Sequence, residues 1–142
     1  LLEHSEVLTR LRTEIDEHLT PGKTPTVEQL GEMTLLNQVI HEGLRLYPPA
    51  WLFGREALGP DVAAGWQVPA GTPALIIPWV LHRHPDFWED PHSFKPERFN
   101  PEANAARPKF AYIPFGGGPR ICIGNHFAQL EMQVILVKLL QT

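Results

Sequence analysis

The residues best suited to chemistry in this 142-residue chain lie in one short segment, Phe115-Gly-Gly-Gly-Pro-Arg-Ile-Cys-Ile-Gly124. Because glycine has no Cβ, the backbone of this segment can approach a flat or bulky group closely. Arg120 adds a permanent cation near the thiol of Cys122. We expect a helix over Ile123–Leu140, whose first N–H groups and dipole would stabilise a thiolate. A glycine loop, an arginine and a thiolate at a helix start suit an anionic cofactor that carries a soft metal.

Three interpretations of Cys122 remain open on chemistry alone. An inert, buried thiol is the commonest fate of a single free cysteine, and composition by itself favours it. A nucleophilic thiol would need a base, and His126 lies one helical turn further on. A metal ligand would be one thiolate that completes the coordination of a cofactor, as in haem held by cysteine. A zinc site is weakly indicated, because the candidate ligands His82, His84 and His92 lack cysteine or carboxylate support.

Proline determines which elements can position this segment. Thirteen of the 15 prolines lie between Pro48 and Pro119, where they forbid long helices and central strands. Coiled coils, simple bundles, solenoids and collagen-like chains are therefore excluded. Helical periodicity predicts an amphipathic helix over Ser5–Leu19 and a second helix that ends before Pro48. Thr26 indicates a capped turn between these two helices. The apolar face expected for the third helix comprises Phe127, Leu130, Val134, Val137 and Leu140.

The middle of the chain is expected to be extended or irregular. Trp51–Leu58 is predicted to be extended, and Trp66–Val68 is predicted to pair with Thr72–Ile77 around a turn at Pro69-Ala70-Gly71. Residues 82–115 are rich in loops, but their aromatic residues favour packing over disorder. Three helices, one hairpin and this much irregular chain bury too little for an independent core. We therefore expect the chain to be part of something larger.

Charge and cysteine content limit the possible partners. The net charge is −4, yet residues 91–142 carry six Lys/Arg against three Asp/Glu. Such a basic portion could face an anionic cofactor or an acidic protein. A nucleic-acid partner is not expected, because there is no Lys/Arg run and the pI is about 6.0. One cysteine excludes a disulfide scaffold. No membrane span is expected in this segment, so the localisation is left open and is cytoplasmic only if no upstream anchor exists.

Several motifs resemble the cytochrome P450 family. Phe115-x-x-Gly118-x-Arg120-x-Cys122-x-Gly124 resembles the haem-binding signature of that family at every fixed position. Glu42-Gly-Leu-Arg45 resembles the Glu-x-x-Arg of its K helix, and Phe94-Lys-Pro-Glu-Arg-Phe99 resembles the Pro-Glu-Arg-Phe of its meander. The resemblance extends from the J helix to the L helix. It implies a partial cytochrome P450 fold, mainly α with a small β-hairpin or sheet and a long irregular meander. Residues 1–142 would be the C-terminal haem-anchoring portion of a single domain.

The resemblance also implies roles for individual residues. The implied cofactor is haem b, with the Cys122 thiolate as the iron ligand. Arg120 carries over directly as a partner of a haem propionate, whereas Arg55 and His82 are expected to reach a propionate from their positions. Glu42, Arg45 and Arg98 would form a structural triad that fixes the meander against the K helix. The expected cofactor-binding residues are Arg55, His82, Phe115, Gly116, Arg120, Cys122, Gly124 and Ala128.

The implied reaction inserts one oxygen atom of O₂ into a small organic, apolar substrate. Two electrons would come from a ferredoxin or a flavoprotein reductase that docks on a basic proximal face containing Arg107, Lys109 and Arg120. No catalytic residue is expected in this segment, and the segment alone is expected to be inactive. Two alternatives stay open: a haem-thiolate isomerase, dehydratase or peroxygenase of the same fold, and a non-catalytic partial gene product.

Overall fold

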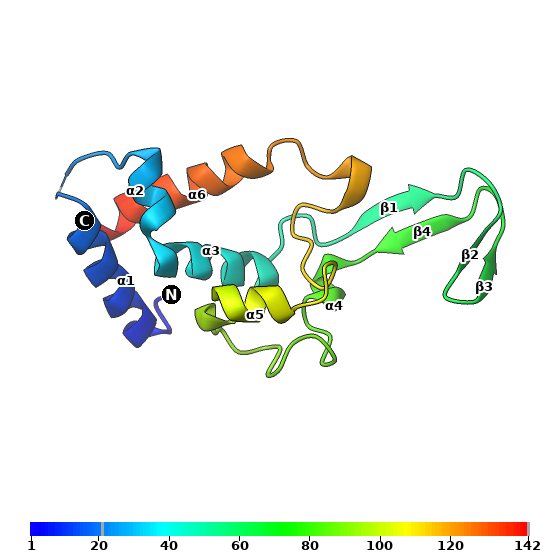
Figure 1. Ribbon diagram of the computed structural model, residues 1–142, viewed down its shortest axis with the longest axis horizontal. Helices are drawn as coiled ribbons and strands as arrows, with labels where there is room; N and C mark the ends of the chain where they lie inside the picture. Colours follow the sequence, from blue (N-terminus) through cyan, green and yellow to red (C-terminus); the bar gives the residue numbers. More distant parts are fainter. Residues whose placement is uncertain (21, 142) are drawn as a thin grey trace.

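The computed structural model of the chain describes residues 1–20 and 22–141. Helices gather at one end of the molecule, and a long ribbon of strands projects from the other (Figure 1). This arrangement confirms the mainly α class with a small antiparallel sheet. The helices are α1 (Ser5–His18), α2 (Val27–Glu32), α3 (Thr34–Leu46), α4 (Pro78–Leu81), α5 (Pro101–Ala106) and α6 (Asn125–Leu140), with 3₁₀ helices η1 (Pro96–Phe99) and η2 (Gly118–Arg120). The strands are β1 (Phe53–Glu56), β2 (Asp61–Ala63), β3 (Trp66–Val68) and β4 (Pro73–Ile76).

The three predicted helices are confirmed as α1, α3 and α6, with ends within two residues of those expected. Thr26 starts α2 with a capping box, in which its hydroxyl and the Gln29 side chain each bond the other's backbone N–H. α3 lies between α1 and α6 in the helical end (Figure 1). The fully buried apolar side chains of the core come from these helices and the segment around α2: Leu11, Ile15, Leu30, Met33, Leu36 and Val137.

A carboxylate on α1 caps the start of α3. The residue before α3, Met33, supplies no capping side chain of its own. Glu14 instead accepts hydrogen bonds from the N–H groups of Leu35 and Leu36, both at 2.8 Å. The negative charge at a helix N-terminus is also favoured by the helix dipole. Glu14 therefore fixes α1 to α3 through backbone groups that would otherwise lack partners.

The ribbon differs from the predicted hairpin. β3 pairs with β2, with Ala63 opposite Trp66, while β4 pairs with β1, with Arg55 opposite Ala74. The prediction that β3 pairs with β4 is wrong, because the chain reverses at Ala64-Gly65, where both residues have positive φ. Gly71 does have the expected positive φ, but its turn returns the chain to β1, since its N–H donates to the carbonyl of Ala57 at 2.8 Å.

The proline-rich segment between β4 and α6 is packed through its aromatic residues, as expected. Trp88 and Phe99 are buried, with ring centroids 6.0 Å apart, and the Tyr112 ring lies 4.9 Å from that of Phe99. Phe87 and Phe110 are exceptions, because both are exposed. The segment therefore has a small aromatic core beside α3.

The apolar face of α6 is only partly as predicted. Val137 is fully buried, and Leu130, Val134 and Leu140 pack against the core. Phe127 is 72% exposed, because the first turns of α6 extend beyond the helical core toward η2 (Figure 1). On the opposite side of the helix, Ile135 is also exposed. α6 is thus apolar on more than the side that packs against the core, a pattern typical of helices that are buried on all sides. No helix in the described part of the chain has both the length and the apolarity needed to cross a membrane.

The Glu14 cap leads to a prediction about stability. Glu14→Ala should lower the free energy of unfolding by about 1–2 kcal/mol, because two helix N–H groups lose a charged acceptor. Urea denaturation measures this loss. Glu17→Ala, an exposed glutamate on the same helix, is the matched control and should change stability by less than about 0.5 kcal/mol. Equal effects of the two substitutions would contradict the capping role.

Candidate functional site

The cysteine loop, residues 113–124, is shaped by backbone hydrogen bonds. The N–H of Cys122 donates to the carbonyl of Phe115 at 2.9 Å, which folds the thiol back over the start of the loop. The N–H of Gly116 donates to the carbonyl of Ile113 at 3.0 Å. Gly116 and Gly118 have φ of +77° and +68°, a conformation that side chains with a Cβ rarely adopt. The glycines are therefore needed for the turn itself.

Cys122 is exposed, so the interpretation as an inert buried thiol is wrong. Within the described residues, no hydrogen bond joins its thiol to His126, which is itself exposed. The apolar side chains of Ile121, Ile123 and Phe127 around it are exposed as well, Ile123 completely. The thiol thus lies on an open apolar surface, where a nonpolar planar group could cover it.

Two exposed cations lie near this surface. Arg120 belongs to η2 and is exposed two residues before the thiol. Arg55 lies on β1, with its guanidinium 5.1 Å from the ring centre of Phe53. That ring lies against the loop, because a Cβ added at Gly116 would be 3.9 Å from it. Arg55, from a distant part of the sequence, is in this way brought toward the cysteine loop.

The remaining predicted residues of the loop are half-buried. Phe115 contributes the carbonyl that accepts from Cys122 and packs against the hydrophobic core. Gly124 precedes α6, and its carbonyl accepts the N–H of Ala128 at 2.9 Å. A Cβ at Gly124 would lie 3.9 Å from the Cys122 sulfur, an ordinary contact. Gly124 and Ala128 therefore set the direction in which α6 leaves the thiol.

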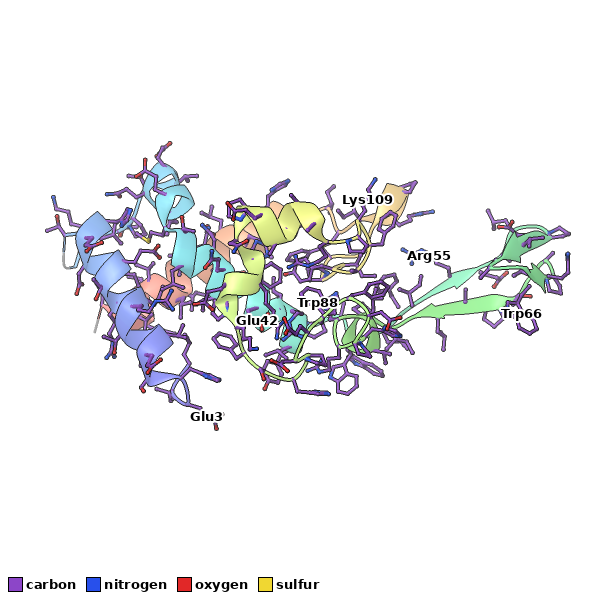
Figure 2. All side chains as sticks on the ribbon, turned by 60° about the horizontal axis from the view of Figure 1, so that its bottom comes forward. Glu3, Glu42, Arg55, Trp66, Trp88 and Lys109 are labelled. Carbon is purple, nitrogen blue, oxygen red and sulfur yellow. The ribbon has the colours of Figure 1, made fainter. Side chains whose placement is uncertain are left out.

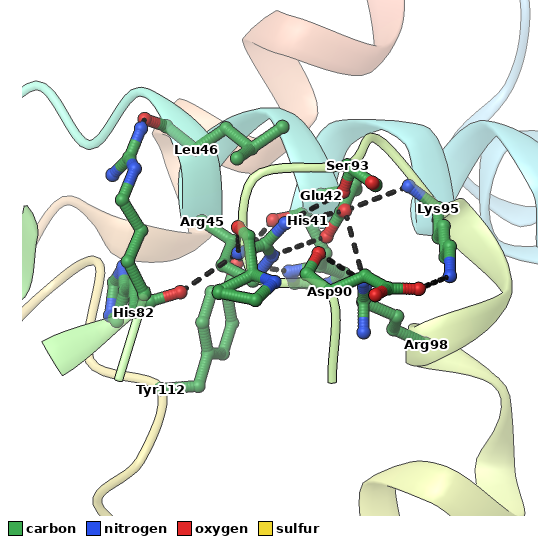
Figure 3. Close-up of polar contacts among 12 residues, drawn as sticks. His41, Glu42, Arg45, Leu46, His82, Asp90, Ser93, Lys95, Arg98 and Tyr112 are labelled. Atoms are coloured by element: carbon green, nitrogen blue, oxygen red, sulfur yellow. Dashed lines mark hydrogen bonds and ion pairs between the residues drawn. The ribbon is translucent and has the colours of Figure 1, made fainter. Parts of the chain in front are cut away.

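A buried ion pair lies behind the loop. Glu42 and Arg45, one helical turn apart on α3, are both 0% exposed and form two parallel hydrogen bonds of 2.7 and 2.8 Å. The other N–H groups of Arg45 donate to the backbone carbonyls of His82, Pro91 and Ser93 at 2.8, 2.7 and 3.1 Å (Figure 3). All five guanidinium N–H groups are thus bonded, which is the condition under which a buried charge is tolerated.

Arg98 joins this pair, so the structure brings the predicted triad together. Its Nε lies 3.5 Å from a Glu42 oxygen, and its Nη2 donates to the carbonyl of Asp90 at 2.8 Å (Figure 3). Burial lowers the pKa of the Arg98 guanidinium. The same Glu42 oxygen accepts the N–H of Lys95 at 2.8 Å. The Glu42 carboxylate therefore contacts both Lys95, just before η1, and Arg98, within η1.

His82 lies in the interior of the structure. It is 0% exposed, and its Nε2 accepts the N–H of Ile113 at 2.8 Å. Burial lowers the pKa of this imidazole to about 4, so the ring stays neutral at physiological pH. The contact of His82 with a propionate stays a prediction, and the one free donor of its ring among the described residues is the buried Nδ1. The described residues contain no group of three His, Cys, Asp or Glu that could hold a metal ion, so His82, His84 and His92 form no zinc site.

Sequence reasoning did not find the groups that complete this network. Three of the partners of Arg45 are backbone carbonyls, which leave no mark in a sequence. The guanidinium groups of Arg45 and Arg107 lie over the ring of Trp88, at 5.0 and 4.5 Å from its centre, and no local pattern in the sequence indicates these contacts. The hydroxyl of Tyr112 donates to the carbonyl of His41 at 3.1 Å, a bond between residues far apart in the chain.

Comparison with known proteins identifies the family. The family model for cytochrome P450 matches residues 1–142. Cytochrome P450 4V2 of Mus musculus is 42% identical over 137 residues, 96% of this chain and 26% of that protein. Cytochrome P450 3A29 of Sus scrofa is 39% identical over 99% of the chain and 28% of that protein. Lithocholate 6-beta-hydroxylase of Mesocricetus auratus is 41% identical over 99% of the chain and 28% of its own length.

The family model and these relatives agree on one family. The chain belongs to the cytochrome P450 family of haem-thiolate monooxygenases. It spans about a quarter of the length of the curated relatives that it matches. The family implies a haem cofactor, and the exposed surface around Cys122 fits one: a soft thiolate donor suits iron, Arg120 and Arg55 offer cations for propionates, and the apolar side chains suit a porphyrin.

The buried ion pair leads to a prediction about stability, and an exposed ion pair of the same length serves as the control. In the full-length protein, Arg45→Met should lower the free energy of unfolding by about 3–5 kcal/mol, because it leaves Glu42 charged and buried. The control is Arg10→Met, which removes an ion pair with Glu97 at the same 2.7 Å but about half exposed, 54% on each side. Its cost should stay below about 1 kcal/mol. Similar losses in urea denaturation would show that burial does not govern the effect.

Proposed function

We propose that this chain is the haem-binding portion of a cytochrome P450 monooxygenase, in which Cys122 would supply the thiolate ligand to the iron of haem b. The observation that carries the proposal is the exposed thiol in a glycine-shaped loop, surrounded by apolar side chains. When bound, haem supplies the iron for oxygen chemistry, and a thiolate ligand pushes electron density that favours O–O cleavage. The reaction proposed for the full-length protein is insertion of one oxygen atom of O₂ into an organic substrate.

In this proposal the chain's own residues hold, orient and shield the cofactor. Arg120 and Arg55 would bind the propionates and so fix how the porphyrin is rotated in its plane. Ile121, Ile123 and Phe127 would keep water away from the sulfur. The hydrogen bond from the Cys122 N–H to Phe115 holds the ligand residue in a single backbone position. Phe115, Gly116, Gly124 and Ala128 would line the same face of the haem.

A small, apolar organic substrate is proposed from the surface near β1 and β4. Trp51 and Leu52 are exposed immediately before β1, and Leu75 of β4 is exposed as well. These side chains would form part of a substrate pocket wall, because buried apolar surface is what retains an apolar ligand. Hydroxylation, the activity in the name of the Mesocricetus auratus relative, is consistent with such a substrate.

The proposed docking site for a redox partner is the basic surface beside the cysteine loop. Lys109 is exposed there, near Phe110 (Figure 2). Arg120, which is also exposed, adds a second positive charge two residues before the thiol. Arg107 is half-buried, and its guanidinium lies over the rings of Trp88 and Phe99 at 4.5 and 4.6 Å, so it contributes less to this surface. A ferredoxin or a flavoprotein reductase with an acidic surface would fit such a site.

We further propose that residues 1–142 are the C-terminal portion of one larger domain. The support is the apolar surface left open on α6 and around Cys122, together with the quarter share of the relatives' length. The remainder of the domain would cover the other side of the haem, so the segment alone is expected to be inactive.

The ligand assignment is tested by the absorption spectrum of the full-length protein, reduced and bound to CO. The parent should show the strongly red-shifted Soret band of thiolate ligation, and Cys122→Ala should lose it completely, because no other residue of the loop offers a thiolate. His126→Ala is the matched control and should keep the band, since His126 makes no contact with the thiol among the described residues. A red-shifted band in Cys122→Ala would refute the proposal.

The docking surface is tested by charge reversal. Lys109→Glu should slow electron transfer from the redox partner about two- to fivefold at low ionic strength, because it places like charge opposite an acidic partner. The difference should shrink as salt is added. Arg12→Glu makes the same charge change on the exposed side of α1, away from the loop, and should have no effect. Stopped-flow reduction measures the rate, and an unchanged rate in Lys109→Glu would exclude this surface.

A further inference from the structure

His82 connects the buried ion pair to the cysteine loop. It caps the C-terminus of α4, where its N–H donates to the carbonyl of Pro78 at 2.8 Å. Its own carbonyl accepts a hydrogen bond from Arg45 at 2.8 Å (Figure 3). Its ring points the other way and accepts the N–H of Ile113, also at 2.8 Å. One residue thus bonds the network with its backbone and the loop with its side chain.

The bond to Ile113 determines the state of the ring. A backbone N–H can only donate, so Nε2 must be unprotonated and the neutral ring must carry its proton on Nδ1. Nδ1 is buried and has no hydrogen-bond partner among the described residues. The bond from Ile113 is therefore the only side-chain hydrogen bond of His82 in that part of the chain. The rings of Tyr112 and Trp88, 5.2 and 6.4 Å away, limit how far the imidazole can tilt.

Ile113 is the first residue of the cysteine loop, so what holds it also holds the thiol. The Ile113 carbonyl accepts the N–H of Gly116, which sets the turn after it. Phe115, within that turn, accepts the N–H of Cys122 at 2.9 Å. A continuous path of hydrogen bonds and short backbone segments therefore runs from Glu42 through Arg45, His82 and the turn to Cys122.

We infer that His82 is a positioning residue, which holds the cysteine loop against the buried Glu42–Arg45 pair and so keeps Cys122 in place as the haem ligand. This inference rests on the proposed function, because it gives His82 a role in thiolate ligation without contact with the haem. It does not depend on the propionate contact expected from the sequence. Loss of the ring acceptor would leave the Ile113 N–H buried and unpaired, and the loop would open to satisfy it.

Two variants of the full-length protein separate this role from simple packing. His82→Leu removes the acceptor and puts in its place an apolar side chain that is one bond shorter. His82→Gln keeps an acceptor, because its side-chain oxygen is the same number of bonds from Cα as Nε2. The control, Asn37→Leu, removes the bonds from Asn37 to the carbonyls of Leu30 and Met33 at the opposite end of α3, together with the bond that Asn37 accepts from Gln133 of α6.

The first measurement is the rate at which the reduced, CO-bound protein loses the red-shifted Soret band of thiolate ligation. The urea concentration is kept too low to unfold the protein. His82→Leu should lose the band about tenfold faster than the parent. His82→Gln should restore the rate to within about twofold, and Asn37→Leu should lower the global unfolding midpoint without changing this rate. Parent-like loss of the band in His82→Leu, or a loss as fast in Asn37→Leu as in His82→Leu, would overturn the inference.

The second measurement requires no haem and keeps the two proposals distinguishable. Amide hydrogen exchange of residues 111–122 in the apoprotein should be faster in His82→Leu than in the parent and in His82→Gln. Unchanged exchange in His82→Leu would overturn the inference even where Cys122 is the proven ligand. A red-shifted band that persists in Cys122→Ala would instead refute the proposed function, while exchange would still decide whether His82 holds the loop.

Discussion

The burial of the Glu42–Arg45 pair is the constraint on which the rest of the molecule depends. A charge removed from water must have every polar atom paired, or the cost of desolvation exceeds what the ion pair returns. One carboxylate accounts for only part of the guanidinium of Arg45, so three backbone carbonyls supply the remainder. Those carbonyls belong to the proline-rich segment, which has little regular structure of its own. The segment therefore acquires its shape by completing the bonds of one arginine on α3.

Hydrogen bonds connect the buried ion pair to the cysteine loop through an intermediate residue, His82. Arg45 holds the backbone of His82, and the ring of His82 holds the start of the cysteine loop. Aromatic packing around Trp88 and Tyr112 makes this connection rigid, since each ring leaves its neighbours little room to turn. Within the loop, glycines with positive φ then turn the backbone so that Cys122 faces outward. A well-ordered interior thus presents one reactive atom on an open surface.

The exposed apolar surface around Cys122 and on α6 is the reason for the proposal that this chain acts as part of a larger protein. Phe127 and Ile123 are exposed beside the thiol, and α6 is apolar on more than the side that packs against α3. Such exposure is costly in water, and in the proposed function the haem and further chain would cover it. The chain's quarter share of its relatives' length agrees with that view.

The sequence by itself determined the three longest helices, through apolar periodicity, and the cysteine loop, through the spacing of glycine, arginine and thiol. Both signals are local, and so both could be predicted. It also placed Glu42 and Arg45 on one face of a helix, but resemblance alone connected them to Arg98. Only the tertiary structure decided the strand pairing. It depends on a turn at Ala64-Gly65, where Ala64 has a positive φ that the sequence does not suggest for alanine. The interior position of His82 also became clear only from the tertiary structure. Its burial and its bond from the Ile113 N–H arise from contacts between segments that are distant in the chain.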